Sequence, residues 1–266
     1  MKIAVIGCAG RMGRTNLRAV LDAGHELVAG VETPGHPALG VDVGTLAGIE
    51  PLGRGAIDDA AGAMAGADAA IEFSTPEATV AHAEAAAAAG CAHVVGTTGL
   101  GADHEAALGA AAARVPIVYA PNMSRGVNLL MELVETVARA LDDEFDVEIV
   151  EMHHNRKVDA PSGTALGLGR AAARGRGVEL DDVAERGRDG PTGARAPGKI
   201  GFAALRGGDV VGDHTVHFAG QGERLELTHR ASDRAIYGRG AVQAAAWTQG
   251  RAPGLYGMAD VLGLRR

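Results

Sequence analysis

The chain has 266 residues, of which 47% are hydrophobic and 22% charged, a balance typical of a soluble globular protein with one large or two small domains. Its formal net charge of -8 argues against nucleic acid and against an anionic membrane as partners, because both are negatively charged. An acidic chain that binds an anionic ligand must concentrate its positive groups locally.

Cysteine content and hydropathy indicate in which cellular compartment the protein is expected. The chain has two cysteines, Cys8 and Cys91, so a disulfide framework is not expected and a reducing environment is the natural interpretation. The N-terminus leads directly into an apolar strand pattern rather than a signal peptide, and no run approaches about 18 uninterrupted apolar residues. We expect a cytoplasmic protein without a membrane partner.

The first 23 residues predict a strand, a glycine loop and a helix. Lys2 to Ile6 is a short apolar run, as in a strand buried on both faces of a parallel sheet, and helical spacing follows from Arg14 to Ala23. The loop reads G-x-x-G-x-x-G, a variant of the commoner dinucleotide pattern in the required strand-to-helix context. A tight turn without a ligand is the alternative. We expect a dinucleotide to contact the loop residues Gly7, Cys8, Ala9, Gly10, Arg11 and Met12.

An acidic residue follows the second predicted strand. Glu26 to Val31 is largely apolar and leads into Glu32, 19 residues after Gly13. A carboxylate at this strand end can accept hydrogen bonds from the ribose hydroxyls of an adenosine. We therefore assign Glu32 to the cofactor site.

Three more strands are predicted in the N-terminal half, whereas Pro34 to Gly66 is rich in turn residues and uninformative. The strands are Ala69 to Phe73, His93 to Val95 and Pro116 to Ala120. Strand ends of a doubly wound parallel sheet line the ligand crevice, so Phe73 and the loop Gly96 to Gly99 should face the cofactor.

The stretch Glu151 to Leu166, EMHHNRKVDAPSGTAL, carries the groups best suited to chemistry. It begins at a predicted strand end and continues as a polar connection, where active-site groups concentrate. From Pro161 the pattern predicts a helix, whose first amides can bind a carboxylate or phosphate. With Lys157 and His153 or His154 as proton donor, the stretch offers a carboxylate cradle beside a general acid.

Each part of this stretch also has a plainer interpretation. Ser-Gly-Thr after a proline is often a helix cap, and paired histidines before a lysine are often a solvated loop. Their coincidence in one short segment favours a site.

The rest of the chain predicts a second domain, beginning with an amphipathic helix from Gly126 to Leu141. Alternation in Phe202 to Leu205, Asp209 to Phe218 and Arg224 to Ala231 predicts an open antiparallel or mixed sheet. Glu179 to Gly198 is charged and rich in glycine and proline, which predicts a mobile surface loop. The fold class is therefore α/β, with a Rossmann-like parallel-sheet nucleotide domain plus a smaller α+β domain.

A metal site is not expected. His214 and His217 are three residues apart, which places them on opposite faces of a strand, and no cysteine or carboxylate cluster completes a ligand shell. We expect a structural or substrate-side role for them.

The pattern E-x-H-H-x-x-K-x-D-A-P-S-G-T resembles that of the 4-hydroxy-tetrahydrodipicolinate reductase (dihydrodipicolinate reductase) family at every fixed position. The likeness extends over nearly the whole chain, and the motif is highly specific. The resemblance implies a discontinuous dinucleotide-binding domain, residues 1–125 and 236–266, and a substrate-binding and oligomerisation domain, residues 126–235. The family forms tetramers through this second domain, so we expect a homotetramer, which would also cover an open sheet.

The resemblance also implies roles for individual residues. His153 and Lys157 are the candidate proton donors, and the sequence does not rank them. The substrate carboxylate would bind His154, Ser162, Gly163 and Thr164. The loops that follow the later strands are implied to contact the dinucleotide through Gly96, Thr97, Thr98, Ala120, Asn122 and Met123.

The implied reaction reduces a cyclic unsaturated dicarboxylate, the dehydrated form of 4-hydroxy-tetrahydrodipicolinate, with a hydride from nicotinamide. Because cofactor and substrate would bind separate domains, we expect closure about a hinge at Asn122 to Gly126. For the cofactor we favour NADH over NADPH. Many relatives are implied to have a basic residue after the acid, whereas this chain has Thr33, and Glu32 would repel a 2′-phosphate. Arg11 and Arg14 are the groups that could still support NADPH.

Two other classes of protein remain as alternatives. A nicotinamide dehydrogenase acting on an amino acid such as aspartate or homoserine would need the glycine loop but not the H-H-x-x-K and P-S-G-T pair. A regulator that binds a dinucleotide without catalysis should have lost Lys157 or the histidines, and all of them are present.

Overall fold

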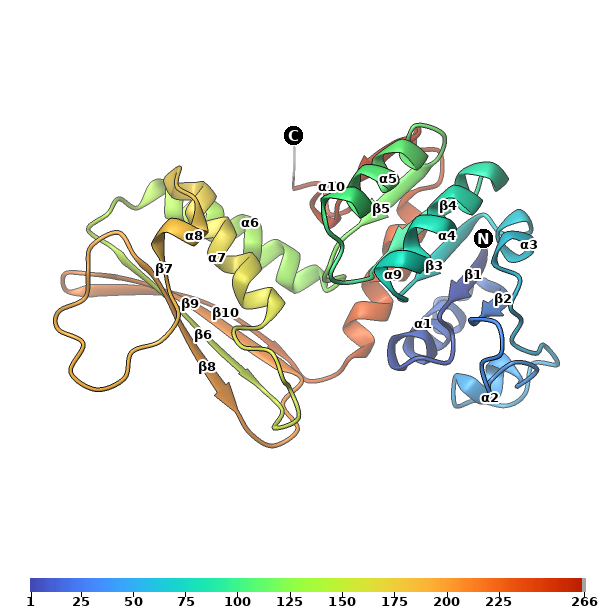
Figure 1. Cartoon of the computed structure of the whole chain (residues 1–266), viewed down its shortest axis with the longest axis horizontal. Helices are drawn as coiled ribbons and strands as arrows, with labels where there is room; N and C mark the ends of the chain where they lie inside the picture. Colours follow the sequence, from blue (N-terminus) through green and yellow to red (C-terminus); the bar gives the residue numbers. More distant parts are fainter. Residues whose placement is uncertain (265–266) are drawn as a thin grey trace. The chain divides into compact units, whose positions relative to one another are not determined.

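The structure is a computed structural model, shown in Figure 1, and it describes residues 1–264. The chain divides into two compact units. The first combines Met1–Arg125 with Arg234–Arg266, and the second is Gly126–Asp233. Each unit contains one sheet and a hydrophobic core of its own.

A six-stranded parallel sheet organises the first unit, with the strand order β11-β5-β4-β3-β1-β2. Strands β1 to β5 are labelled in Figure 1. The strands are β1 (Lys2–Ile6), β2 (Glu26–Val31), β3 (Ala69–Glu72), β4 (Ala92–Val95), β5 (Pro116–Tyr119) and β11 (Gly254–Tyr256). The chain moves outward from β1 to β2 on one side and from β3 onward on the other. Ligands of doubly wound sheets bind at the carboxyl ends of the strands at this reversal, which here lies between β1 and β3.

Helices cover both faces of this sheet. Because successive side chains of a strand point to opposite faces, Ile3 and Val5 pack into one core and Ala4 and Ile6 into another. The first core includes α1 and α9, the second α3 and α4, and α5 packs beside α4. The helices are α1 (Arg11–Asp22), α3 (Ala60–Ala65), α4 (Pro76–Ala89), α5 (Ala102–Ala112), α9 (Ala235–Trp247) and α10 (Met258–Val261).

The turn-rich segment 34–66 is organised by one carboxylate. Asp42 caps the short helix α2 (Val43–Leu46) and accepts backbone N–H groups of Gly44, Thr45, Leu52 and Arg54. The bonds from Leu52 and Arg54 are the main reasons that the pKa of this carboxyl is lowered to about 2. The segment therefore has order that composition alone did not predict.

The predicted strands of the first unit are confirmed, with ends that differ by one residue. Helix α1 begins at Arg11 rather than Arg14, because the second half of the glycine loop is already helical. Strand β11 was not predicted. It is a three-residue edge strand that pairs in parallel with β5, too short to give a periodic pattern.

A mixed five-stranded sheet organises the second unit, in the order β10-β9-β6-β8-β7. The strands are β6 (Asp146–His153), β7 (Ala184–Glu185), β8 (Ile200–Arg206), β9 (Gly212–Gly220) and β10 (Glu223–Ala231). Strand β6 is central, because it pairs in parallel with β8 and antiparallel with β9. The predicted open mixed sheet is confirmed, although β9 begins at Gly212 rather than Asp209.

Two helices cover one face of this second sheet. Alternate residues of β6 are buried, and Val147 and Ile149 pack against α6 and α7. The same alternation continues through Glu151 and His153, so these polar residues lie on the buried face of the strand. The helices of this unit are α6 (Arg125–Ala140), α7 (Gly163–Arg176) and α8 (Leu180–Val183).

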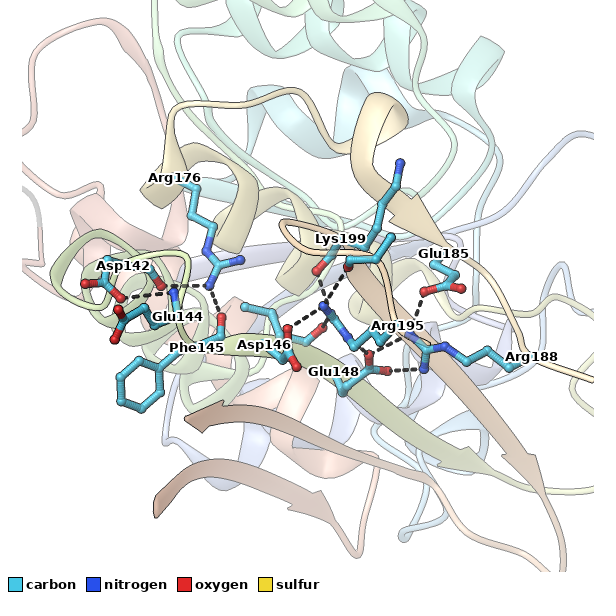
Figure 2. Close-up of polar contacts among 12 residues, drawn as sticks. Asp142, Glu144, Phe145, Asp146, Glu148, Arg176, Glu185, Arg188, Arg195 and Lys199 are labelled. Atoms are coloured by element: carbon cyan, nitrogen blue, oxygen red, sulfur yellow. Dashed lines mark hydrogen bonds and ion pairs between the residues drawn. The ribbon is translucent and has the colours of Figure 1, made fainter. Parts of the chain in front are cut away.

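The segment Glu179 to Gly198 was predicted as a mobile surface loop, and this is wrong for its first part, where α8 and β7 form. The later part is attached to β6 by arginine (Figure 2). Arg195 donates to Asp146 Oδ1 at 2.6 Å and to Glu148 Oε1 at 2.8 Å, and Arg188 binds both oxygens of Glu148. Carboxylates on β6 therefore neutralise both arginines and hold this part of the segment against the strand.

No helix within residues 1–264 combines the length and the apolar character that crossing a membrane requires.

Candidate active site

The loop between β1 and α1 depends on glycine. Gly7 has a φ of 73°, and a Cβ at this position would lie 2.6 Å from the carbonyl oxygen of Phe73. A Cβ at Gly13 would lie 1.9 Å from the carbonyl oxygen of Gly7. Gly10 is the N-cap of α1, whose first turn has no acidic residue and no side-chain cap. The positive end of the helix dipole therefore meets a backbone that a diphosphate can approach closely, as a dinucleotide requires.

The side chains of this loop differ in their access to a ligand. Cys8 is buried in the core, and burial, with the nearby Glu32 carboxylate, raises the pKa of its thiol to about 12. Its backbone is therefore the part that a ligand could contact. Met12 is half-buried and Arg11 is exposed, whereas Arg14 donates from Nε to the carbonyl of Ala9 at 2.9 Å.

Glu32 lies against the glycine loop. Its Oε1 accepts the backbone N–H of Ala9 at 2.7 Å, and its Oε2 accepts that of Thr33 at 3.3 Å. The loop itself is attached to the end of β2, since the N–H groups of Gly7 and Cys8 both donate to the carbonyl of Val31. The structure therefore brings the acid and the glycine loop together.

The ends of β3 and β4 are in contact. Gly96 lies on the ring of Phe73, because a Cβ at Gly96 would be 2.3 Å from Cζ of that ring. The N–H of Ser74 donates to Thr97 Oγ1 at 3.0 Å. Thr97 is buried with its side chain inward, and Thr98 is exposed.

The end of β5 continues the same edge of the sheet. The N–H of Ala120 donates to the carbonyl of Val95 at 3.1 Å, and Asn122 Oδ1 accepts the N–H of Ser124 at 2.8 Å. Met123 is buried in the core beneath α9, where a Cβ at Gly240 would lie 1.8 Å from its carbonyl oxygen. Ala120 and Met123 therefore offer backbone rather than side-chain groups to a ligand.

In the second unit, Glu151 is the centre of a buried polar network. Its Oε2 accepts the Nδ1 proton of His153 at 2.6 Å, and its Oε1 accepts the backbone N–H of Ser162 at 3.1 Å. Arg206 donates to both carboxylate oxygens at 2.8 Å and also to the carbonyl of Asp159. Burial would raise the pKa of Glu151, but the hydrogen bonds from Arg206 and His153 outweigh it and lower the pKa.

His153 is 8% exposed and packs edge-on against His214, with ring centroids 5.1 Å apart. Its Nε2 lies above Gly212, where a Cβ would come within 2.9 Å of that nitrogen. Burial, and then the nearby His153, lower the pKa of His214 to about 4, so His214 is neutral at neutral pH. Because Nδ1 of His153 is held by Glu151, Nε2 is the ring atom that can exchange a proton.

The start of α7 is capped by Ser162. Its Oγ accepts the N–H of Ala165 at 3.1 Å and lies 3.0 Å from Nε2 of His214. Gly163, the first residue of the helix, is exposed, and a Cβ there would meet nothing within 4 Å. The plainer interpretation as a helix cap is therefore correct for Ser162, and the space over Gly163 leaves room for a ligand at the helix start.

The polar connection holds the remaining predicted residues. Lys157 is 19% exposed in its side chain, and its Nζ donates to Asp159 Oδ1 at 2.8 Å. The backbone N–H of His154 donates to the carbonyl of Val210, just before β9, at 2.8 Å. The structure thus joins Lys157 to Arg206 through Asp159, and His153 to Ser162 through Glu151.

Sequence reasoning missed three features of these sites. Arg206 is the last residue of β8, 55 positions from Glu151, and only strand pairing brings them together. His214 was given only a general role, and its contact with Ser162 depends on the antiparallel pairing of β9 with β6. Glu72 has a buried polar cluster of its own, which no motif marked. Within residues 1–264, no group of three or more histidine, cysteine or carboxylate residues is arranged to hold a metal ion.

A doubly wound parallel sheet with a glycine loop at its reversal point and an acid at the end of β2 defines a dinucleotide-binding oxidoreductase fold. The chain matches the family described as Dihydrodipicolinate reductase, N-terminus, over residues 1–123 and Dihydrodipicolinate reductase, C-terminus, over residues 126–262. It therefore belongs to the dihydrodipicolinate reductase family, whose members are NAD(P)H-dependent reductases.

Similar proteins match over almost the full length. The 4-hydroxy-tetrahydrodipicolinate reductase of Rhodopseudomonas palustris (strain BisB18) is 55% identical over 265 residues, 99% of this chain and 98% of the relative. That of Parvibaculum lavamentivorans is 58% identical over 266 residues, 99% of this chain and 98% of the relative. A solved structure, dipicolinate-bound dihydrodipicolinate reductase from Paenisporosarcina sp. TG-14, shares the fold with a TM-score of 0.77 and 21% identity, covering 98% of each chain.

Proposed function

We propose that the protein reduces the dehydrated form of 4-hydroxy-tetrahydrodipicolinate to tetrahydrodipicolinate with NADH or NADPH, in the diaminopimelate and lysine pathway. The observation that carries this proposal is the network around Glu151. One buried carboxylate fixes a candidate proton donor, His153, and the start of α7, where a substrate carboxylate can bind. A reductase of a cyclic dicarboxylate needs both groups in one place.

When bound, the reduced nicotinamide supplies a hydride, so each turnover consumes one NADH or NADPH and one proton. His153 and Lys157 are our candidates for the source of that proton. His153 can donate from Nε2 while Glu151 holds Nδ1 and so fixes the orientation of the ring. Lys157 donates as an ammonium, and Asp159 directs its Nζ.

The substrate carboxylate is assigned to His154, Ser162, Gly163 and Thr164. Gly163 is exposed at the first turn of α7 and leaves space for an anion. Both hydrogen-bonding sides of the Ser162 hydroxyl are engaged, one by Ala165 N–H and the other by His214. Its main contribution is therefore to hold the helix start in place. The reductase from Paenisporosarcina sp. TG-14, solved with dipicolinate bound, offers a dicarboxylate of the same kind for binding tests.

The cofactor is assigned to the glycine loop and to the ends of β2 to β5 in the first unit. NADH is favoured over NADPH, because the carboxylate of Glu32 is held beside the loop by Ala9 N–H and would face a 2′-phosphate. Arg14 is occupied by the carbonyl of Ala9, so exposed Arg11 is the stronger candidate for partial acceptance of NADPH.

We further propose that the protein is a homotetramer of the cytoplasm, assembled through the sheet of the second unit. Leu205 on β8 is 50% exposed and pairs with Met152 on the face of the sheet opposite α6 and α7, which suits a sheet face covered by another subunit. Light scattering coupled to gel filtration tests this assembly, and a monomeric mass at micromolar concentration would contradict it.

The central experiment follows the oxidation of NADH and of NADPH optically, with substrate generated in place by the preceding synthase. Turnover with either cofactor that depends on the synthase supports the proposed reaction. A higher kcat/KM with NADH supports the argument from Glu32. If neither cofactor is oxidised although both bind, the proposed substrate is wrong.

A further inference from the structure

The first unit contains a buried polar cluster that the proposed reaction does not use. Its centre is Glu72, the last residue of β3, whose side chain is fully buried. Its Oε1 contacts Nδ1 of His82 at 2.8 Å and its Oε2 lies 2.7 Å from Nε2 of His93, while the hydroxyls of Ser74 and Thr79 donate to Oε1. Burial alone would raise the pKa of Glu72, but the hydrogen bonds from the imidazoles outweigh it, and the pKa lies below its usual range.

A chain of hydrogen bonds leads from this carboxylate to the loop after β4. Thr97 Oγ1 accepts the N–H of Ser74 at 3.0 Å and lies 3.1 Å from Thr79 Oγ1, which in turn lies 3.1 Å from Glu72 Oε1. The Thr79 hydroxyl is the donor in these contacts, and its one proton has three acceptors within reach: Glu72 Oε1, Thr97 Oγ1 and, at 3.0 Å, the carbonyl of Thr75. Thr79 therefore links the buried carboxylate to the loop after β4. Hydrogen-bonding groups that are linked in this way in a buried site polarise and strengthen one another.

This chain joins the two loops that follow adjacent strands, residues 73–75 after β3 and 96–98 after β4. The N–H of Gly96 donates to the carbonyl of Glu72 at 2.8 Å, and Gly96 packs on the Phe73 ring. Thr79, in the first turns of α4, is fully buried between the loops. Backbone, ring and hydroxyl contacts therefore fix one loop against the other at the carboxyl edge of the sheet.

We infer that Glu72, acting through Thr79, is a positioning residue that holds the loops 73–75 and 96–98 in the arrangement that binds the nicotinamide cofactor. This inference rests on the proposed function, which assigns Phe73 and Thr97 to the cofactor. Glu72 touches no ligand in this role, because its side chain is buried. Loops that are already ordered avoid the entropy loss of ordering on binding, so the cluster should strengthen cofactor affinity.

The test compares Thr79→Val, which keeps the shape of the side chain but removes the hydroxyl, with Thr79→Ser, which restores the hydroxyl. Thr248→Val is the matched control. Thr248 is also buried in the first unit, and its hydroxyl donates to the carbonyl of Ala245 at the end of α9. The chain continues from there to the start of β11, at the amino ends of the parallel strands and so away from the loops 73–75 and 96–98. The measurements on the full chain are the Kd of NADH by fluorescence, the Kd of dipicolinate, the Tm, and the hydrogen exchange of the Ser74 amide.

We expect Thr79→Val to raise the Kd of NADH about fivefold or more, the effect of losing roughly one hydrogen bond, and to speed exchange at Ser74. Thr79→Ser should remain within about twofold of the wild type. Dipicolinate affinity should not change in either variant. Thr248→Val should lower the Tm without changing the Kd of NADH.

Equal NADH affinity in the wild type and Thr79→Val would overturn the positioning role, as would an equal loss in Thr79→Val and Thr248→Val. If Thr79→Val does not fold, Glu72→Gln supplies the same comparison, because it keeps the shape of the side chain and removes the charge at the centre of the cluster. Failure of the wild type to bind NADH or NADPH would instead count against the proposed function, so the two failures are distinguishable.

Discussion

Glu151 and His153 lie two residues apart on the buried face of β6, and the carboxylate accepts the Nδ1 proton of the imidazole at 2.6 Å. Strand geometry alone places both on one face. Arg206, paired with His153 in the β6 to β8 register, then neutralises the carboxylate from the neighbouring strand. The His153 imidazole is thus oriented by Glu151 of the same strand, and Glu151 is in turn fixed by Arg206 of the neighbouring strand β8.

Replacing Glu151 with glutamine should lower kcat by about 10- to 100-fold, because His153 would lose the carboxylate that fixes the orientation of its ring. The measurement is steady-state turnover at saturating cofactor, together with the Kd of NADH, which should not change. Glu148→Gln is the matched control. Glu148 is on the same strand and also binds arginine, but it points to the other face, so turnover should remain near that of the wild type. Unchanged turnover in Glu151→Gln would exclude a role for the carboxylate in catalysis.

The same carboxylate should make stability depend on pH. The pKa of Glu151 in the folded protein is lowered, because the bonds from Arg206 and His153 outweigh burial, so the unfolded chain takes up a proton more readily than the folded one. Its stabilising contribution is therefore fully present above about pH 4.3, the unfolded value, and is lost as pH falls through the folded pKa. The difference in unfolding free energy between wild type and Glu151→Gln should be largest near pH 7 and should shrink below about pH 4. Urea titrations at several pH values measure it, and a difference that grows on acidification would have the wrong sign.

His153→Ala and Lys157→Ala should each lower turnover far more than cofactor affinity, by about 100-fold in kcat against less than about twofold in the Kd of NADH. The physical reason is that both side chains lie in the second unit, whereas the cofactor is assigned to the first. Arg156→Ala, in the same connection and exposed, is the control. A variant of either residue with full turnover would remove that residue from the list of proton donors.

Periodicity and local motifs predicted most of the fold. Most strands of both sheets and the glycine loop are marked by patterns within a few residues of one another, and Glu32 follows its strand directly. The short edge strands β7 and β11 carry no such pattern. The irregular stretches were harder, because the order of 34–66 depends on Asp42 accepting N–H groups from residues up to 12 positions away. Likewise, Arg195 is stabilised by Asp146 and Glu148, almost 50 positions earlier.

The candidate site was predictable as a set of residues but not as a network. The motif from Glu151 to Thr164 could be identified from the sequence, whereas its connections could not. Glu151 meets Arg206, and Ser162 meets His214, only through the pairing of β8 and β9 with β6. A single sequence does not specify which of several arginines occupies the neighbouring strand position.

Cofactor preference should respond to the residue beside Glu32. Thr33→Arg places a guanidinium next to the position expected for a 2′-phosphate, and we expect kcat/KM with NADPH relative to NADH to rise about tenfold. Thr33→Gln, of similar length but neutral, should leave the ratio within about twofold. The ratio of the two kcat/KM values under identical substrate supply is the measurement. A wild-type preference for NADPH would show that the carboxylate of Glu32 does not repel the phosphate as argued.

Arg195 should stabilise the segment 186–199 against β6. Its side chain is 18% exposed and donates to Asp146, to Glu148 and to the carbonyls of Val147 and Lys199 (Figure 2). Arg195→Met leaves these groups without their donor. Because the carboxylates are partly exposed and water can hydrate them again, we expect the free energy of unfolding to fall by only about 1–2 kcal/mol.

Arg186→Met is the control, because Arg186 is 54% exposed and lies 3.6 Å from Asp181. Hydrogen exchange over 186–199 should accelerate in Arg195→Met and not in Arg186→Met. If both variants exchange like the wild type, other contacts hold this segment and the arginine network contributes little to its order.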